Sequence, residues 1–189
     1  MSRVRVVHYV NQFFANIGSE DKADVPVGLL EGAVGPGKRL QILLGDTAEI
    51  VVTVYCGDDY FAAHTKNALE SILQIARDYN VKLLVAGPAF ASGRYGFACA
   101  EVCHAVSSSL GLDCVSGMHP ENPGVGIYKQ YMDRKVFALP TGEAVSGMED
   151  ALSRMAQCVS KLAAGLVLGR PSIEGYIPRG FRRDEVVDK

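Results

Sequence analysis

The chain has 189 residues, of which 48% are hydrophobic and 21% charged, and its net charge at pH 7 is −2. These values suit one globular domain and give no electrostatic support for binding nucleic acid or an anionic membrane. No apolar run approaches the roughly 20 residues that cross a bilayer, and the first residues lead into a strand rather than a signal peptide, so we expect a cytoplasmic protein.

The first half of the chain predicts two strands and two helices around a long loop. A β-branched run over 3–10 is the first strand, and residues 15–38 show no regular period, which is typical of a functional or partner-facing loop. A short helix over 37–44 and a strand over 49–55 follow. Apolar residues spaced three and four apart then predict an amphipathic helix over 60–79.

The second half alternates short apolar strands with helices. In chain order we expect a strand over 82–86, a helix over 93–110, a strand over 113–116, a short helix over 125–132, a strand over 135–139 and a helix over 144–166. The remaining residues predict an extended tail. One domain is therefore expected over 1–168, followed by a tail over 169–189.

This alternation indicates an α/β fold. The expected architecture is a three-layer, doubly wound, mostly parallel sheet of five strands, of the Rossmann or flavodoxin type. The segments that follow the five strands hold most of the glycines, prolines and polar residues. They should gather along one edge of the sheet, which is where ligands bind in this class.

The stretch from Leu83 to His104 is the predicted centre of a site. An apolar strand runs into a glycine-lined turn and then into a helix, an arrangement that presents backbone N–H groups and side chains to a ligand. In this turn Arg94 and Tyr95 are candidates for binding a substrate carboxylate. A surface salt bridge is the alternative for Arg94.

Other candidates also follow strands. Asn11 and Gln12 follow the first strand, and Asn122 lies in a proline-bracketed loop after the fourth; all three are predicted to bind substrate. In the same loop His119 and Glu121 are candidate catalytic residues for proton transfer.

The five cysteines are odd in number and lie in or beside apolar segments, so they need not pair in a reducing compartment. Cys56 ends a strand just before a predicted helix start, where a thiolate would be stabilised, and it is a candidate catalytic residue. Cys99 and Cys103 would share a helix face, a spacing that suits metal ligands better than a disulfide. Buried packing is the alternative for this pair and the expectation for Cys114 and Cys158, and no metal site is assigned.

Nucleotide motifs are poorly matched. Gly32–Lys38 satisfies the spacing GxxxxGK, but Arg39 stands where Ser or Thr would bind Mg²⁺, and Pro36 removes one N–H of the phosphate cradle. No GxGxxG follows the first strand. We therefore expect neither nucleotide hydrolysis nor a dinucleotide fingerprint, and a plain loop over Gly32–Lys38.

Six segments together resemble one family. They are HYVNQFFANIGSEDKAD (8–24), EGAVGPGK (31–38), CGDDYF (56–61), AGPAFASGRYGFAC (86–99), SGMHPENPGV (116–125) and EGYIPRG (174–180). In this order they resemble the N-terminal portion of the selenoprotein B component of the glycine, sarcosine, betaine and D-proline reductases. The resemblance covers nearly the whole chain.

The resemblance implies anaerobic, cytoplasmic reductive cleavage of the C–N bond of an amino acid. In that family a pyruvoyl group on a partner subunit can hold an amine substrate as a Schiff base, and a selenocysteine of component B attacks the α-carbon. Family members are longer, and their selenocysteine lies in the half that this chain does not match. The resemblance therefore implies selenocysteine and pyruvoyl groups in partner parts and no cofactor in this chain.

We accordingly expect a subunit or fragment of an amino-acid reductase that is not active alone and helps to form the substrate pocket. Its expected partners are other reductase subunits and a small amino-acid or amine substrate, within an oligomer. Two alternatives stay open: a non-catalytic, flavodoxin-like module for small-molecule binding or assembly, and a thiol redox protein that uses Cys56.

Overall fold

A computed structural model describes residues 3–180 and has a six-stranded sheet in the order β2-β3-β1-β4-β5-β6. Five of these strands are parallel to one another, as the sequence predicted. The strands are β1 (Val4–Asn11), β2 (Gly28–Glu31), β3 (Ala48–Cys56), β4 (Leu83–Ala86), β5 (Asp113–Met118) and β6 (Val136–Pro140).

The sixth strand corrects the expected number of five strands in a mostly parallel sheet. It is β2, which lies within the segment expected to be a loop and pairs antiparallel with β3 at one edge of the sheet. It has only four residues, and none of them is fully buried. So short and half-exposed a strand carries no hydrophobic period that could distinguish it from a loop.

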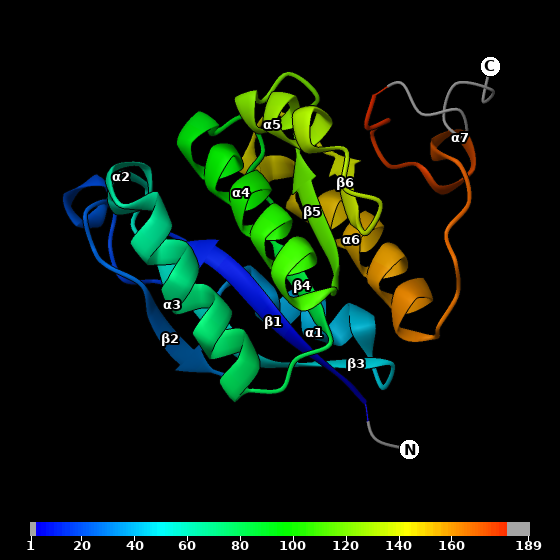
Figure 1. The fold of residues 1–189 in the computed structure, drawn as a ribbon, viewed down its shortest axis with the longest axis horizontal. Helices are drawn as coiled ribbons and strands as arrows, with labels where there is room; N and C mark the ends of the chain where they lie inside the picture. The colour runs from blue at the N-terminus through cyan, green and yellow to red at the C-terminus, as the bar shows by residue number, and fades with distance from the viewer. Residues whose placement is uncertain (1–2, 181–189) are drawn as a thin grey trace.

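Helices cover both faces of the sheet, which confirms the three layers (Figure 1). On one face lie α1 (Pro36–Leu44) and α6 (Met148–Ala163), and on the other lie α2 (Asp58–Ala63), α3 (Thr65–Asp78), α4 (Gly93–Leu110) and α5 (Pro123–Tyr131). Two short 3₁₀ helices, η1 (Glu20–Lys22) and η2 (Val145–Gly147), and the one-turn helix α7 (Pro171–Glu174) complete the elements.

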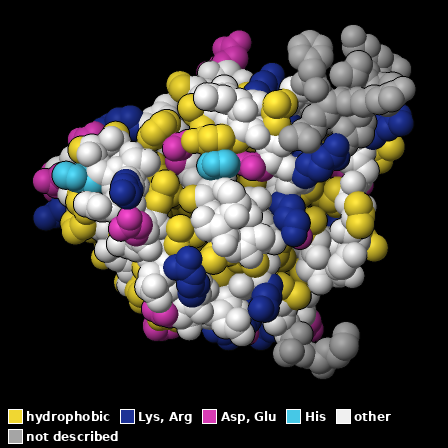
Figure 2. All heavy atoms as spheres, viewed as in Figure 1, with side chains coloured by type: hydrophobic (Ala, Val, Ile, Leu, Met, Phe, Trp, Pro, Cys, Tyr) yellow, Lys and Arg dark blue, Asp and Glu magenta, His cyan; other side chains and the backbone are white. Residues whose placement is uncertain are grey.

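The continuous apolar run of β4 follows from these two cores. Successive side chains of a strand point to opposite faces, so Leu84 and Ala86 enter the core beneath α3 and α4. Leu83 and Val85 enter the core beneath α1 and α6. Charged side chains of both signs are interspersed on the face shown in Figure 2, as the near-neutral composition predicts.

The predicted single helix over 60–79 is wrong in one respect. It consists of α2 and α3, which are separated by His64, whose φ of −132° and ψ of 45° are not helical. The first of the two begins at Asp58, so Asp58 and Asp59 lie in its first turn, where negative charge is favourable, and not before it.

The described part of the tail packs against the domain. Tyr176 and Ile177 are buried, and the Ile177 N–H donates a hydrogen bond to the Ala138 carbonyl of β6 at 2.8 Å. The Arg179 guanidinium lies 5.0 Å from the centre of the Phe137 ring and 4.9 Å from that of Tyr176. Residues 181–189, which the sequence also assigned to the tail, lie outside the described residues.

Candidate functional site

The C-terminal ends of the five parallel strands lie along one edge of the sheet, as the sequence predicted. After β1 the chain continues through η1 and β2 to α1 on one face of the sheet. After β4, the neighbouring strand, it continues to α4 on the opposite face. Such a switch point creates a crevice between the two strand ends. A cavity of about 340 Å³ lies there.

Segments that follow four of the parallel strands line this cavity, together with Ser19 and the first residue of η1. The lining residues are Asn11, Gln12, Phe13, Phe14, Ser19, Glu20, Asp58, Ala89, Phe90, Ser92, Tyr95, Glu143, Ala144 and Val145. We call this the switch-point cavity. It contains Asn11, Gln12 and Tyr95 of the predicted substrate-binding residues.

A larger cavity of about 530 Å³ lies elsewhere, and none of the predicted site residues lines it. Its walls include Asp113 at the start of β5, Phe137 of β6 and Tyr176 of the tail. It therefore lies away from the strand ends at which this fold class binds ligands, and size alone does not make it the better candidate.

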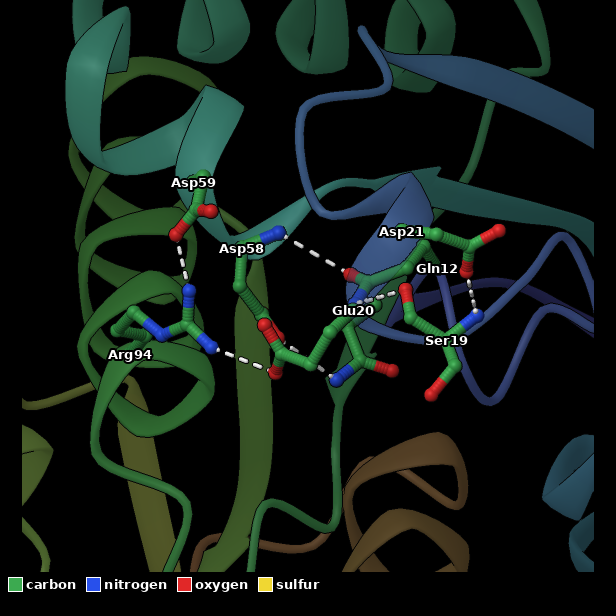
Figure 3. Close-up of polar contacts among 8 residues, drawn as sticks. Gln12, Ser19, Glu20, Asp21, Asp58, Asp59 and Arg94 are labelled. Carbon is green, nitrogen blue, oxygen red and sulfur yellow. Dashed lines mark hydrogen bonds and ion pairs between the residues drawn. The ribbon is translucent and has the colours of Figure 1, made fainter.

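A buried polar network forms one wall of the switch-point cavity. Asn11 Nδ2 donates a hydrogen bond to Asp58 Oδ2 at 3.1 Å. The Asp58 backbone N–H donates to Gln12 Oε1 at 3.1 Å, as Figure 3 shows. Gln12 Nε2 donates in turn to the Ser19 carbonyl at 3.3 Å. The three side chains of Asn11, Gln12 and Asp58 are each at most 5% exposed. The network thus ties the ends of β1 and β3 together.

Asp58 is a residue of this wall that was not among the site residues predicted from the sequence. Burial raises the pKa of its carboxyl, and the hydrogen bond from Asn11 partly opposes that rise. Its Oδ1 is buried and has no hydrogen-bond partner among the described residues. The feature of the sequence that could have identified Asp58 is an acidic residue two positions after the end of a strand.

The loop over 19–25 closes over the first turn of α2. The Gly57 N–H donates to the Val25 carbonyl at 2.8 Å, and the Asp59 N–H donates to the Ala23 carbonyl at 2.8 Å. A Cβ on Gly57 would lie 2.2 Å from the Ala23 carbonyl oxygen, so only glycine permits this approach. The closure places Glu20 at the cavity wall.

Arg94 lies beside the cavity and does not line it. Its Nη1 pairs with Asp59, and its Nη2 pairs with Glu20 at 2.8 Å (Figure 3). These hydrogen bonds, the one to Glu20 most of all, raise the pKa of Arg94. The geometry is that of the salt-bridge alternative, and carboxylate binding by Arg94 stays a prediction.

Aromatic side chains form a second wall. Tyr95 is fully buried, and its ring centre lies 5.8 Å from that of Phe14. Phe14 lies 5.1 Å from Phe13 in an edge-to-face arrangement, and Phe13 is 54% exposed. The cavity therefore has an apolar wall that reaches from the core to the surface.

The loop after β5 supports the cavity from outside. Asn122 Nδ2 donates to the carbonyls of Phe90 at 2.8 Å and Ser92 at 3.0 Å. Its Oδ1 accepts a hydrogen bond from the Gly124 N–H at 2.8 Å and so caps α5. All these polar atoms serve the fold, and substrate binding by Asn122 stays a prediction.

The two proton-transfer candidates of this loop lie at the rim. The His119 N–H donates to the Phe90 carbonyl at 2.9 Å, and His119 Nε2 lies 3.9 Å from Glu143 Oε1. Glu121 is exposed, and its backbone N–H donates to His119 Nδ1 at 3.1 Å. Neither His119 nor Glu121 lines the switch-point cavity, whereas their neighbours Phe90 and Glu143 do.

The cysteines are all buried and none is paired. Cys56 is fully buried, and burial raises the pKa of its thiol to about 12, so the predicted stabilised thiolate is wrong. The cause is that Cys56 joins the core beneath α2 and α3 instead of facing a helix N-terminus. Burial likewise raises the pKa of Cys99. Among residues 3–180, no three His, Cys, Asp or Glu side chains are placed to bind a metal.

Within the described range, no helix combines the length and apolar character needed to cross a membrane.

Known proteins similar to this chain are subunits of amino-acid reductase complexes. It is 47% identical to the glycine reductase complex component B subunit gamma of Carboxydothermus hydrogenoformans over 184 residues, which is 97% of this chain and 41% of that protein. It is 42% identical to the sarcosine reductase complex component B subunit beta of Peptoclostridium acidaminophilum, with 96% and 41% covered. Identity to the betaine reductase complex component B subunit beta of the same organism is 36%, with 94% and 40% covered.

The chain thus spans about two fifths of the length of the curated relatives it matches. No solved structure matches it. The family described as glycine/sarcosine/betaine reductase selenoprotein B matches residues 3–189. The chain therefore belongs to the glycine/sarcosine/betaine reductase selenoprotein B family.

Proposed function

We propose that this chain is a subunit or fragment of an amino-acid reductase and that its switch-point cavity forms part of the substrate pocket for reductive C–N cleavage. The observation that carries the proposal is the family match over residues 3–189. The cavity supports it, because it lies at the strand ends where this fold class binds small ligands.

The nucleophile in this proposal comes from outside the chain. All five cysteines are buried, and the pKa of Cys56 is raised to about 12, so none offers an accessible thiolate. The family resemblance implies a selenocysteine and a pyruvoyl group in partner parts. The selenocysteine would attack the α-carbon, while this chain would bind and enclose the substrate.

The cavity mouth suits a partner surface. Phe13 is 54% exposed and Val145 is 53% exposed, and both line the cavity. Large apolar side chains at the rim of a pocket are typical of sites that another protein covers. We therefore assign the other reductase subunits to this edge of the sheet as partners.

A reconstitution assay tests the proposal. The chain is combined with the remaining subunits of a glycine, sarcosine or betaine reductase complex, under anaerobic conditions with a dithiol reductant. Release of ammonia, methylamine or trimethylamine is then measured with and without the chain. We expect amine release only when the chain is present, and release that does not depend on the chain would reject the reductase role.

Two matched variants test the cavity. Phe13→Ala removes a half-exposed aromatic side chain from the cavity wall, whereas Ile42→Ala removes an apolar side chain that is 67% exposed on α1 and outside the wall. We expect KM for the substrate to rise only in Phe13→Ala. Equal effects of the two substitutions would reject the cavity as part of the pocket.

A non-catalytic binding or assembly module is the second candidate. It is favoured by the positions of Cys56 and Glu121, predicted catalytic residues that lie outside the cavity wall. Such a module would still bind a small molecule or the partner subunits, but amine release in the reconstitution assay would not depend on it.

A further inference from the structure

The switch-point cavity has an acidic wall. Three carboxylates line it, those of Glu20, Asp58 and Glu143, and none of its described lining residues is Lys, Arg or His. Arg94, the nearest cation named above, is already paired with Glu20 and with Asp59. One arginine shared by two carboxylates leaves that group with a net negative charge. The negative charge of the cavity wall would therefore repel an anion that enters the cavity.

Asp58 contributes to this charge from a buried position. Its side chain lies in the cavity wall at 4% exposure and receives one hydrogen bond, on Oδ2 from Asn11. Oδ1 has no partner among the described residues. A carboxylate in such surroundings is costly unless a positive charge or a hydrogen-bond donor approaches it. The charge of Arg94 already stabilises this carboxylate in part, and a cation in the cavity would stabilise it further.

The aromatic wall favours the same kind of ligand. Phe13, Phe14 and Tyr95 form a continuous series of ring contacts, and Phe90 also lines the cavity. Aromatic faces attract ammonium groups through their quadrupole and accommodate methyl groups by dispersion. Acidic and aromatic walls together match an alkylammonium ion in charge and in surface.

From these observations we infer that the switch-point cavity binds the ammonium end of its ligand, a small alkylammonium group, with Asp58 as the residue that determines specificity for positive charge. The inference rests on the proposed function and refines it, because it assigns the amine end and not the carboxylate end of a substrate to this cavity. The carboxylate end would then be held by groups outside the cavity wall.

Three small probes of similar size and different charge test this inference on the full chain. Trimethylammonium carries a positive charge, tert-butanol is neutral and pivalate is negative. Each is titrated into ¹⁵N-labelled protein at pH 7, and backbone amide chemical shifts of the cavity residues are followed by NMR. We expect saturable shifts with trimethylammonium, at an affinity at least about tenfold higher than for tert-butanol, and no saturable shifts with pivalate.

Two matched variants assign the effect to Asp58. Asp58→Asn removes the charge and keeps an oxygen that can accept the hydrogen bond from Asn11, and we expect it to weaken trimethylammonium binding about tenfold. Asp46→Asn makes the same change at an exposed residue between α1 and β3, outside the cavity wall, and should leave affinity within about twofold. The spectrum of each variant reports whether it is folded, and the three-probe comparison in the unsubstituted chain stands even if Asp58→Asn does not fold.

The outcomes are distinct. Pivalate binding as tightly as trimethylammonium, or no probe shifting the cavity amides, would overturn the inference. Equal losses in Asp58→Asn and Asp46→Asn would overturn the role of Asp58. None of these results affects chain-dependent amine release in the reconstitution assay, so failure of the inference and failure of the proposed function can be told apart.

Discussion

Asn122 is predicted to be a structural residue whose loss destabilises the fold. Its side chain is 4% exposed and makes three hydrogen bonds, two as donor to the carbonyls of Phe90 and Ser92 and one as acceptor from the Gly124 N–H. Together these bonds hold the loop after β4 against the start of α5. We expect Asn122→Ala to release this loop.

The magnitude follows from the three bonds. Loss of the cap on α5 costs about 1 kcal/mol. Each of the two donated bonds contributes a further ~1 kcal/mol, because the Phe90 and Ser92 carbonyls keep other backbone partners, the N–H groups of His119 and Gly96. We therefore expect Asn122→Ala to lower the free energy of unfolding by about 3 kcal/mol.

Urea denaturation followed by circular dichroism measures this change. Asn122→Asp keeps the cap acceptor but loses both donors, so it should cost at least about 2 kcal/mol. Glu121→Ala, at the exposed neighbouring residue, should stay within about 0.5 kcal/mol of the unsubstituted chain. A loss below about 1 kcal/mol in Asn122→Ala would refute the structural role and favour the predicted contact with substrate.

Two further predictions concern buried groups. Burial lowers the pKa of His8 from 6.5 to about 4. Between these two pH values the unfolded chain binds more protons than the folded chain. The free energy of unfolding should therefore increase by up to about 3 kcal/mol as pH rises through this window. His8→Gln should remove this pH dependence of urea unfolding, whereas His64→Gln, at an exposed histidine, should leave it in place. Equal pH profiles for the two variants would contradict the assignment of the dependence to His8. All five cysteines should react with a thiol reagent in denaturant, and each should react in the native protein far more slowly than free cysteine. A fast native reaction that is lost in Cys56→Ser would instead support thiol redox chemistry.

The sequence predicted the layers and the parallel strands because each of those elements carries its own hydrophobic pattern. The four apolar residues of β4 are buried on both faces, and this burial produces the unbroken run from Leu83 to Ala86. The edge strand β2 is held by its pairing with β3, not by a buried face. Its existence depends on a neighbour that is distant in sequence, so no local pattern could predict it.

The location of the cavity was predictable for a similar reason, but the roles of its residues were not. Strand ends can be identified in the sequence, and in a parallel sheet they must share an edge. The partners of a side chain cannot be identified in this way. Arg94 is separated from Asp59 by 35 residues and from Glu20 by 74, and only the fold brings these three side chains together.

Burial then decides which polar residues at this edge serve the fold and which remain for a ligand. Asn11, Gln12 and Asn122 are amides that both donate and accept, and in each of them both the oxygen and the nitrogen make a hydrogen bond within the protein. Asp58 is an acceptor only when ionised, and the single donor that reaches it leaves one oxygen without a partner. Among the buried polar side chains of this edge, the amides are therefore neutral, and Asp58 carries the one incompletely satisfied carboxylate. That asymmetry is the physical reason to expect a positively charged group in the cavity, and it depends on Asp58 alone among the buried residues of the wall.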